Sequence, residues 1–230
     1  MITQSGRATI SHRKGDSNIN RFIMSLRKAE KRNEDFFEMP CPEYDVRVVY
    51  SNREYDELFG TSNEHVTHRG GGLLPSGTFL VYFDSLKELD IFSGGAFDEF
   101  VFHEINHVFY TKLVGSQCPF WLIEGLATYH TRTWEVDKEG WRTYFRGVSQ
   151  LEKYYYYRWI KKRYYKDPGT FIVFSTLVYG YLYETFGKKK ILTLLQEYSK
   201  KRSKKTFEKA FKRVFGIGMK QAAQEAIQTG

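Results

Sequence analysis

The sequence predicts an α+β fold in which a small mixed sheet is followed by a mostly helical C-terminal part. Two short runs rich in β-branched and aromatic residues, 47–50 and 78–83, lie in the first half of the chain and are typical of strands. Apolar residues at helical spacing surround them and predict helices on either side. The last ninety residues, 141–230, contain no comparable strand and are predicted to be helical.

Composition is that of a packed globular protein. The 230 residues are 41% hydrophobic and 17% aromatic, enough for one sizeable core or for two small lobes flanking a cleft. Two cysteines cannot form a disulfide framework and fit a reducing compartment. The chain opens on polar residues, and its most apolar run, 171–186, is too short to span a bilayer. We therefore expect a soluble, cytoplasmic protein with no transmembrane segment.

Charge is distributed unevenly along the chain. Residues 1–140 contain 15 Lys and Arg against 21 Asp and Glu, whereas residues 141–230 contain 20 against 6. The basic C-terminal half suggests an anionic partner, either nucleic acid or an acidic protein surface. The alternative is a solvated basic face on surface helices.

Three parts are expected along the chain. Residues 1–15 have little to bury and are predicted to form a flexible N-terminal arm. Residues 16–140 are predicted to form a subdomain with the sheet and two helices that carry the candidate site, and residues 141–230 a basic helical subdomain.

The first elements have recognisable boundaries. A helix is predicted over 16–38, with Asp16 or Ser17 as its N-cap. Pro40 and Pro42 end it, because proline cannot continue a helix. A strand at 47–50, a short helix at 54–58 closed by Gly60, and a strand at 78–83 follow.

Helices dominate the remainder. One is predicted over 96–114, with Gly115 as its C′ stop, and Pro119 starts another that runs to about residue 134. Further helices are predicted at 148–165, 171–186, 188–198 and 207–228, the last broken near 216–218.

The helix predicted over 96–114 contains His103-Glu104-Ile105-Asn106-His107. Residues four apart share a helix face, so both imidazoles can converge on one metal ion, while Glu104 is placed to reach a water on that metal. Zinc is the expected ion, and a catalytic zinc needs a third protein ligand and an open position. The alternative is a pair of core histidines bonded to backbone carbonyls.

Glu124 is the expected third ligand. It follows His107 by 17 residues, enough for one helix to end and a second to pack back against it. A carboxylate among the apolar residues 121–127 is costly to bury without a cation. A His₂Glu set would hold one zinc per chain and leave a position for water. The alternative is an ordinary exposed glutamate.

These residues also carry a family resemblance. The His103–His107 motif followed by Trp121-Leu122-Ile123-Glu124-Gly125-Leu126-Ala127 resembles the gluzincin metallopeptidases, and most closely their peptidase MA-like branch. The similarity covers roughly residues 43–230 and implies a thermolysin-like zincin catalytic domain. The metzincin pattern does not fit, because Tyr110 and Leu113 stand where it needs Gly and His.

The resemblance implies roles for individual residues. His103, His107 and Glu124 would be the metal ligands, and Glu104 the general base acting on a zinc-bound water. The predicted strand Thr78–Phe83 would be an edge strand that pairs with an extended peptide substrate.

The oxyanion donor is less clearly marked. Relatives often carry a tyrosine where this chain has Phe171-Ile172, so Tyr179 or Tyr165 is the candidate donor, with His130 as a second. Asp98 is expected either to orient a ligand imidazole or, as a first-turn acidic residue, to interact with the helix dipole.

The leading functional hypothesis is a zinc-dependent metallopeptidase that hydrolyses peptide bonds. The alternative is a catalytically inactive zincin-fold module that binds nucleic acid through the basic half, where Tyr154–Tyr157, Arg158 and Lys161–Arg163 combine aromatic and cationic side chains. A third hypothesis is an amphipathic membrane-surface helix at 153–166.

Overall fold

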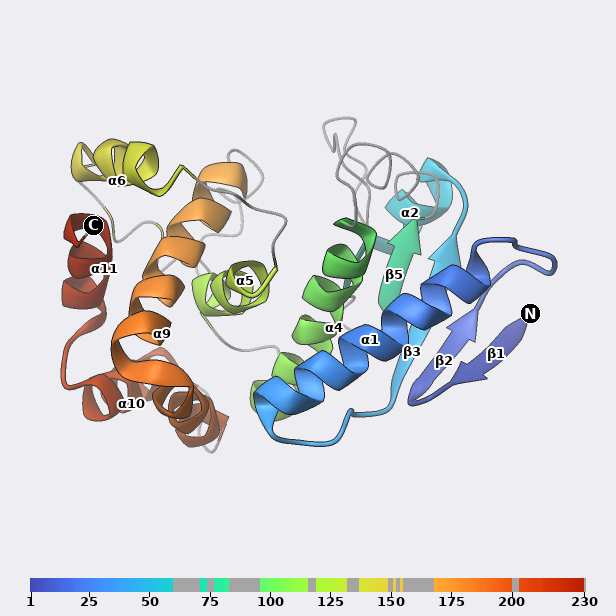
Figure 1. Cartoon of the computed structure of the whole chain (residues 1–230), viewed down its shortest axis with the longest axis horizontal. Helices are drawn as coiled ribbons and strands as arrows, with labels where there is room; N and C mark the ends of the chain where they lie inside the picture. Colours follow the sequence, from blue (N-terminus) through green and yellow to red (C-terminus); the bar gives the residue numbers. More distant parts are fainter. Residues whose placement is uncertain are drawn as a thin grey trace. The chain divides into compact units, whose positions relative to one another are not determined.

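A computed structural model describes most of the chain, and the predicted α+β class is confirmed (Figure 1). Its contacts divide it into two compact units, Met1–Lys112 and Leu113–Gly230. The boundary predicted from the sequence was residue 140. In the structure, the segment 113–140 belongs instead to the unit that contains the C-terminal helices. The described residues are 1–59, 71–73, 77–82, 96–115, 119–131, 137–148, 151, 154, 168–199 and 203–229.

The first unit contains a five-stranded mixed sheet with the order β1-β2-β3-β5-β4. The inner pairs β2–β3 and β3–β5 are parallel, whereas β1–β2 and β4–β5 are antiparallel. The small mixed sheet predicted from the sequence is therefore present. The strands are β1 (Ile2–Ser5), β2 (Ala8–Ser11), β3 (Tyr44–Val49), β4 (Gly71–Leu73) and β5 (Phe79–Tyr82).

The N-terminal residues belong to this sheet, so the prediction of a flexible arm over 1–15 was wrong. β1 and β2 form a hairpin, and β2 pairs in parallel with β3 from Ala8 opposite Tyr44 onward. Gly6 turns the hairpin with a φ of 61°, a conformation that glycine adopts without steric cost. The Met1 amino group also donates a hydrogen bond to the His12 carbonyl at 2.7 Å.

The predicted strand at 78–83 is present as β5, but it is an inner strand. Phe79 pairs with Val46 of β3 on one side and with Leu73 of β4 on the other. The expectation that Thr78–Phe83 is a free edge for a peptide substrate was therefore wrong. Within the described part of the sheet, the outer strands are β1 and β4.

Helices cover both faces of β5. On one face, Phe22 of α1 (Ile19–Phe37) lies 6.3 Å from Phe79, and equally 6.3 Å from Phe97 of α4 (Ala96–Val114), measured between ring centroids. On the other face, Tyr55 of α2 (Asn52–Phe59) lies 6.3 Å from Tyr82. All four β5 residues are consequently buried, as expected of a strand that has both faces covered.

The ends of these helices follow local chemistry. Asn18, rather than Asp16 or Ser17, is the N-cap of α1, and the Asp16 carboxylate accepts a hydrogen bond from its backbone N–H at 2.8 Å. Gly115 follows α4 with a φ of 81°, which confirms the predicted C′ glycine.

The second unit is built from helices that pack on α9, a long helix broken at Gly187 (φ 79°). The break lies between the two helices predicted at 171–186 and 188–198. Two further helices separated near Gly216 are also as predicted, whereas α6 was missed and α5 ends at Tyr129, before the expected residue 134. The helices are α5 (Phe120–Tyr129), α6 (Lys138–Arg146), α9 (Pro168–Ser199), α10 (Lys204–Phe215) and α11 (Met219–Gln228).

Aromatic packing forms much of the core of this unit. The Trp121 ring lies 6.4 Å from those of Phe207 and Phe211, so α5 and α10 share one cluster. Pro119 occupies the N-cap position of α5 rather than its first turn. Among the described residues, no helix is both long and apolar enough to cross a membrane.

Candidate metal centre

His103 and His107 lie one turn apart on α4, as the spacing predicted. Both side chains are half-buried, and their ring centroids are 4.6 Å apart with an interplanar angle of 84°. The two imidazoles therefore occupy one face of the helix and lie close enough to share an ion.

Glu124 completes the group. One ligand atom from each of His103, His107 and Glu124 lies within 4.8 Å of the other two. Ligand atoms of a tetrahedral zinc ion are about 3.4 Å apart, given bond lengths of about 2.1 Å. Small side-chain rotations would close the difference, and two imidazoles with one carboxylate are donors that zinc favours. This His-His-Glu group can hold a metal ion.

Two of the carboxylates in the region are almost completely buried. Glu104 and Glu124 each have 7% of their surface exposed. An ionised carboxylate is stable in such surroundings only when hydrogen bonds or a cation compensate for the water that it loses. Burial thus argues against the view of Glu124 as an ordinary exposed glutamate, and a cation bound to the three ligands would supply compensation.

The position of Glu124 depends on a close approach of α5 and α9. A Cβ atom added to Gly125 would lie 2.3 Å from the Ser175 carbonyl oxygen and 2.9 Å from the Tyr179 Cβ. Only glycine permits this approach, because every other residue would force the two helices apart. The residue after Glu124 therefore fixes how closely the helix that carries the carboxylate packs on α9.

The two predicted oxyanion donors lie together. His130 is the C-cap residue of α5, and its Nε2 is 2.9 Å from the Tyr179 hydroxyl. Tyr179 is fully buried, whereas His130 is half-buried. Burial, followed by the nearby Tyr183 and Tyr129 hydroxyls, raises the pKa of Tyr179 well above its usual value, so the phenol keeps its proton. The other candidate, Tyr165, lies outside the described residues.

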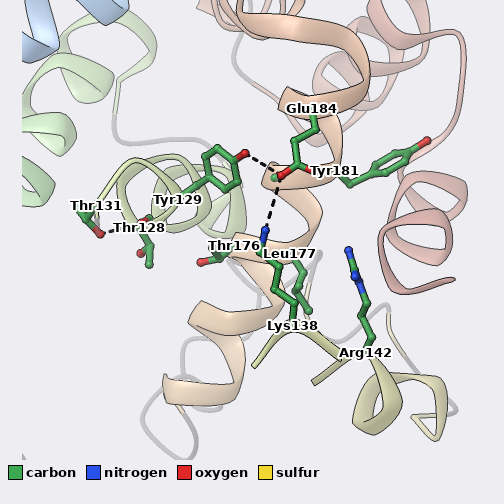
Figure 2. A pocket seen from close by; sticks show the side chains of 10 residues that line it. Thr128, Tyr129, Thr131, Lys138, Arg142, Thr176, Leu177, Tyr181 and Glu184 are labelled. Carbon is green, nitrogen blue, oxygen red and sulfur yellow. Dashed lines mark hydrogen bonds and ion pairs between the residues drawn. The ribbon is translucent and has the colours of Figure 1, made fainter. Parts of the chain in front are cut away.

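A cavity of about 320 Å³ lies between α5, α6 and α9 (Figure 2). Its Glu184 carboxylate accepts a hydrogen bond from the Tyr129 hydroxyl at 2.9 Å and lies 3.7 Å from the Lys138 ammonium. The negative charge of the Glu184 carboxylate and the positive charge of the Lys138 ammonium therefore partly neutralise each other. The lining residues are Thr128, Tyr129, Thr131, Lys138, Arg142, Thr176, Leu177, Gly180, Tyr181 and Glu184.

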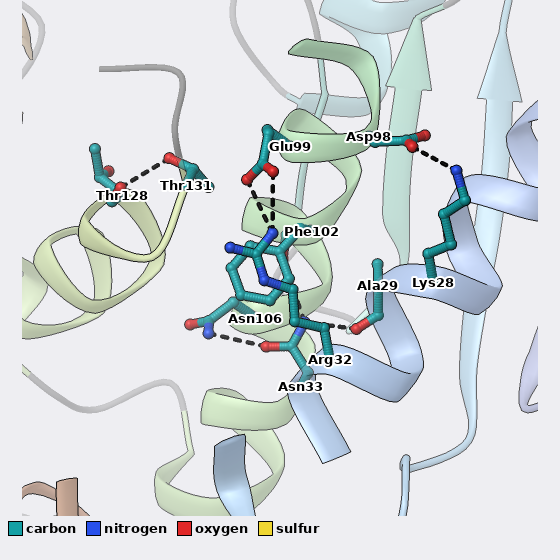
Figure 3. Close-up of polar contacts among 10 residues, drawn as sticks. All are labelled: Lys28, Ala29, Arg32, Asn33, Asp98, Glu99, Phe102, Asn106, Thr128 and Thr131. Atoms are coloured by element: carbon teal, nitrogen blue, oxygen red, sulfur yellow. Dashed lines mark hydrogen bonds and ion pairs between the residues drawn. The ribbon is translucent and has the colours of Figure 1, made fainter. Parts of the chain in front are cut away.

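Asp98 contacts α1. Its carboxylate accepts hydrogen bonds from the Ser25 hydroxyl at 2.5 Å and from the Lys28 ammonium at 2.7 Å, the latter drawn in Figure 3. Burial alone would raise the pKa of Asp98, but the bonds from Lys28 and Ser25 outweigh it and lower the pKa. Asp98 is in the first turn of α4, where an acidic residue also favours the helix dipole. These contacts support the dipole interpretation over a role in orienting an imidazole.

Most of the basic aromatic segment predicted to bind nucleic acid, and the proposed membrane-surface helix at 153–166, lies outside the described residues. Tyr154 is described, and it is buried against Phe174 at 5.0 Å and Phe145 at 5.4 Å between ring centroids. This tyrosine is therefore a core residue rather than a surface for stacking bases.

Two asparagines near the site were not identified from the sequence. The Asn106 side chain, inside the histidine motif, donates a hydrogen bond to the Asn33 side chain at 2.9 Å, and both residues are fully buried. They are 73 residues apart, so spacing could not pair them. The available signal was a carboxamide that shares its helix face with the aromatic residues Phe102, Phe109 and Tyr110.

No protein-family model matches this chain, and no match was found among curated proteins. The α+β fold and the His-His-Glu group are accordingly the findings on which a function can be argued.

Proposed function

We propose that this protein is a zinc-dependent metallopeptidase of the gluzincin type, with a thermolysin-like catalytic domain. The observation that carries the proposal is the approach of His103, His107 and Glu124 to within 4.8 Å of one another. The motif around them adds a glutamate directly after the first histidine, the position expected for a general base.

Each residue has a role in this proposal. His103, His107 and Glu124 hold the ion. Bound zinc would supply a Lewis acid that lowers the pKa of water and polarises a peptide carbonyl. Glu104 accepts the proton of the attacking water and passes it to the leaving amine.

His130 is the group proposed to donate a hydrogen bond to the oxyanion, because Tyr179 is fully buried and half-buried His130 is the more accessible of the two. Tyr179 retains its proton, and its hydroxyl can donate a hydrogen bond to His130 Nε2 at 2.9 Å. In that arrangement the imidazole proton is on Nδ1.

An extended peptide remains the proposed substrate, but it cannot pair with β5. Its place in the proposal is along β4 (Gly71–Leu73), an outer strand in the described part of the sheet. A free strand edge offers backbone N–H and carbonyl groups to an incoming peptide.

The decisive test is the Glu104→Gln variant. We expect it to bind one zinc per chain with the affinity of the wild type and to cleave an unfolded-protein substrate at least about 100-fold more slowly, since a general base contributes that much. Glu139→Gln, which alters an exposed carboxylate on α6, is the matched control and should cleave normally. Full activity of Glu104→Gln, or no cleavage by zinc-loaded wild type, would contradict the proposal.

One observation favours nucleic-acid binding as a second candidate. Lys205, Lys209 and Lys212 are exposed and recur at i, i+4 and i+7, so they form one cationic stripe along α10. Lysines that neutralise phosphates make binding strongly dependent on salt. Retention of single-stranded RNA at 50 mM but not 300 mM salt, lost when the three lysines are changed to alanine, would support this candidate. Equal retention by the variant would remove it.

A further inference from the structure

α1 makes a row of polar contacts along α4 (Figure 3). The Arg32 guanidinium lies 3.0 Å from the Glu99 carboxylate and 3.9 Å above the Phe102 ring. Asn33 lies one residue further along α1 and contacts the next turn of α4. These contacts link α1 to the turns of α4 on which the metal ligands lie.

The Asn33 side chain forms two hydrogen bonds with a single turn of α4. Its Nδ2 donates to the Phe102 carbonyl oxygen at 3.4 Å, and its Oδ1 accepts from Asn106 Nδ2 at 2.9 Å. Phe102 and Asn106 are four residues apart and each immediately precedes one of the histidines, His103 and His107. Asn33 thus holds both ends of the turn that separates the proposed ligands.

The orientation of both carboxamides is determined by these partners. Asn33 Nδ2 faces two backbone carbonyl oxygens, those of Phe102 and of Ala29 at 3.0 Å, which can only accept. The Asn33 Oδ1 must therefore face Asn106, and Asn106 must present its amide nitrogen in return. Flipping either side chain would set like atoms against each other, so the pair can form in only one way.

The rotation of α4 about its axis decides where the imidazoles point. At about 100° per residue, the α4 positions that make polar contacts with α1, namely 98, 99, 102 and 106, fall within one sector of about 100°. His103 and His107 fall in the adjacent sector. A small rotation of α4 relative to α1 would therefore swing both imidazoles together.

We propose that Asn33 and Asn106 are positioning residues, which lock the rotation of α4 and so preset His103 and His107 for metal binding. The inference rests on the proposed metal site, because the asparagines act through the two ligands. Helix α1, which lies outside the histidine motif, would then help to set the positions of the metal ligands through Asn33.

The test compares single and double replacements with leucine, whose side chain has the same number and branching of heavy atoms as asparagine but no polar atoms. Asn33→Leu and Asn106→Leu each leave a buried polar group without its partner, whereas the double variant removes the pair and can recover stability. Unfolding by denaturant and affinity for Zn²⁺ are measured for each. The visible absorption spectrum of the Co²⁺ form reports ligand geometry. Ser25→Ala, which alters the Asp98 contact in the first turn of α4, is the matched control.

The positioning role predicts that the double variant regains stability but binds Zn²⁺ about 10–100-fold more weakly, with an altered Co²⁺ spectrum, whereas Ser25→Ala binds normally. Wild-type affinity and spectrum in a folded double variant would overturn it. If the double variant does not fold, Asn106→Ala decides, with at least a fivefold loss of affinity expected and an unchanged value contradicting the proposal. Failure of the positioning role alone would leave metal binding by the wild type intact. Failure of the proposed function would appear instead as a wild type that binds no metal, so the two failures are distinguishable.

Discussion

Tyr179 illustrates how one buried hydroxyl can influence a more accessible side chain. The Tyr179 hydroxyl lies 2.9 Å from His130 Nε2. We predict that Tyr179→Phe slows peptide cleavage about tenfold with little change in KM, since a misdirected imidazole weakens stabilisation of the transition state more than binding. Zinc affinity should be unchanged.

The control is Tyr183→Phe. The Tyr183 ring packs on His130 at 4.9 Å between centroids, so this variant keeps the aromatic contact and removes only a neighbouring hydroxyl. If both variants slow cleavage equally, the hydrogen bond is not what matters, and the role assigned to Tyr179 is wrong.

Gly125 gives a second prediction at the scale of the residue. A Cβ there would lie 2.3 Å from a backbone oxygen of α9, so Gly125→Ala should lower the free energy of unfolding by about 2 kcal/mol or more and displace Glu124. Gly169→Ala places a methyl group where nothing lies within 4 Å, and should be neutral or stabilising by up to about 1 kcal/mol. Chemical denaturation measures both, and equal stability of the two variants would show that the close approach is not required.

Sequence reasoning was most informative for single residues whose chemistry is local. The spacing of His103 and His107 placed them on one helix face, and the apolar setting of Glu124 indicated a buried carboxylate. Asn33 could not be linked to Asn106, because contact between segments 73 residues apart is decided by how the helices pack.

At the scale of the element, the contact between α1 and α4 should respond to pH. Asp98 has a lowered pKa in the folded protein, so its stabilisation is present above its unfolded value, about 3.9, and is lost as the pH falls through the folded value. We predict that the stability difference between wild type and Asp98→Asn shrinks as the pH falls from 6 to about 3. Denaturant unfolding at several pH values measures it, and a constant difference would contradict the assigned contacts.

Strands were harder to predict than helices in this chain. The first two strands have four residues each and are rich in Ser, Thr and Gln, so they resemble a polar arm until pairing with β3 buries Ala8 and Ile10. The neighbours of β5 are likewise fixed by pairing partners distant in sequence. The helices, by contrast, were predictable from the local spacing of apolar residues and from proline and glycine at their ends.

For the whole molecule, the difference between the predicted and observed boundaries has a packing explanation. The charge change near residue 140 suggested a division there, yet α5 packs extensively on α9 through Gly125 and therefore belongs with the C-terminal helices. Charge marks solvated surfaces, whereas the division into units follows buried contacts.

The central claim is that two imidazoles and one carboxylate coordinate a single zinc ion. A crystal structure of the zinc-loaded protein, with anomalous data collected at the zinc edge, tests it most directly. The account predicts one strong peak per chain, about 2.0–2.2 Å from a nitrogen of His103, a nitrogen of His107 and an oxygen of Glu124. No peak at these side chains, or a zinc ion bound without Glu124, would contradict it.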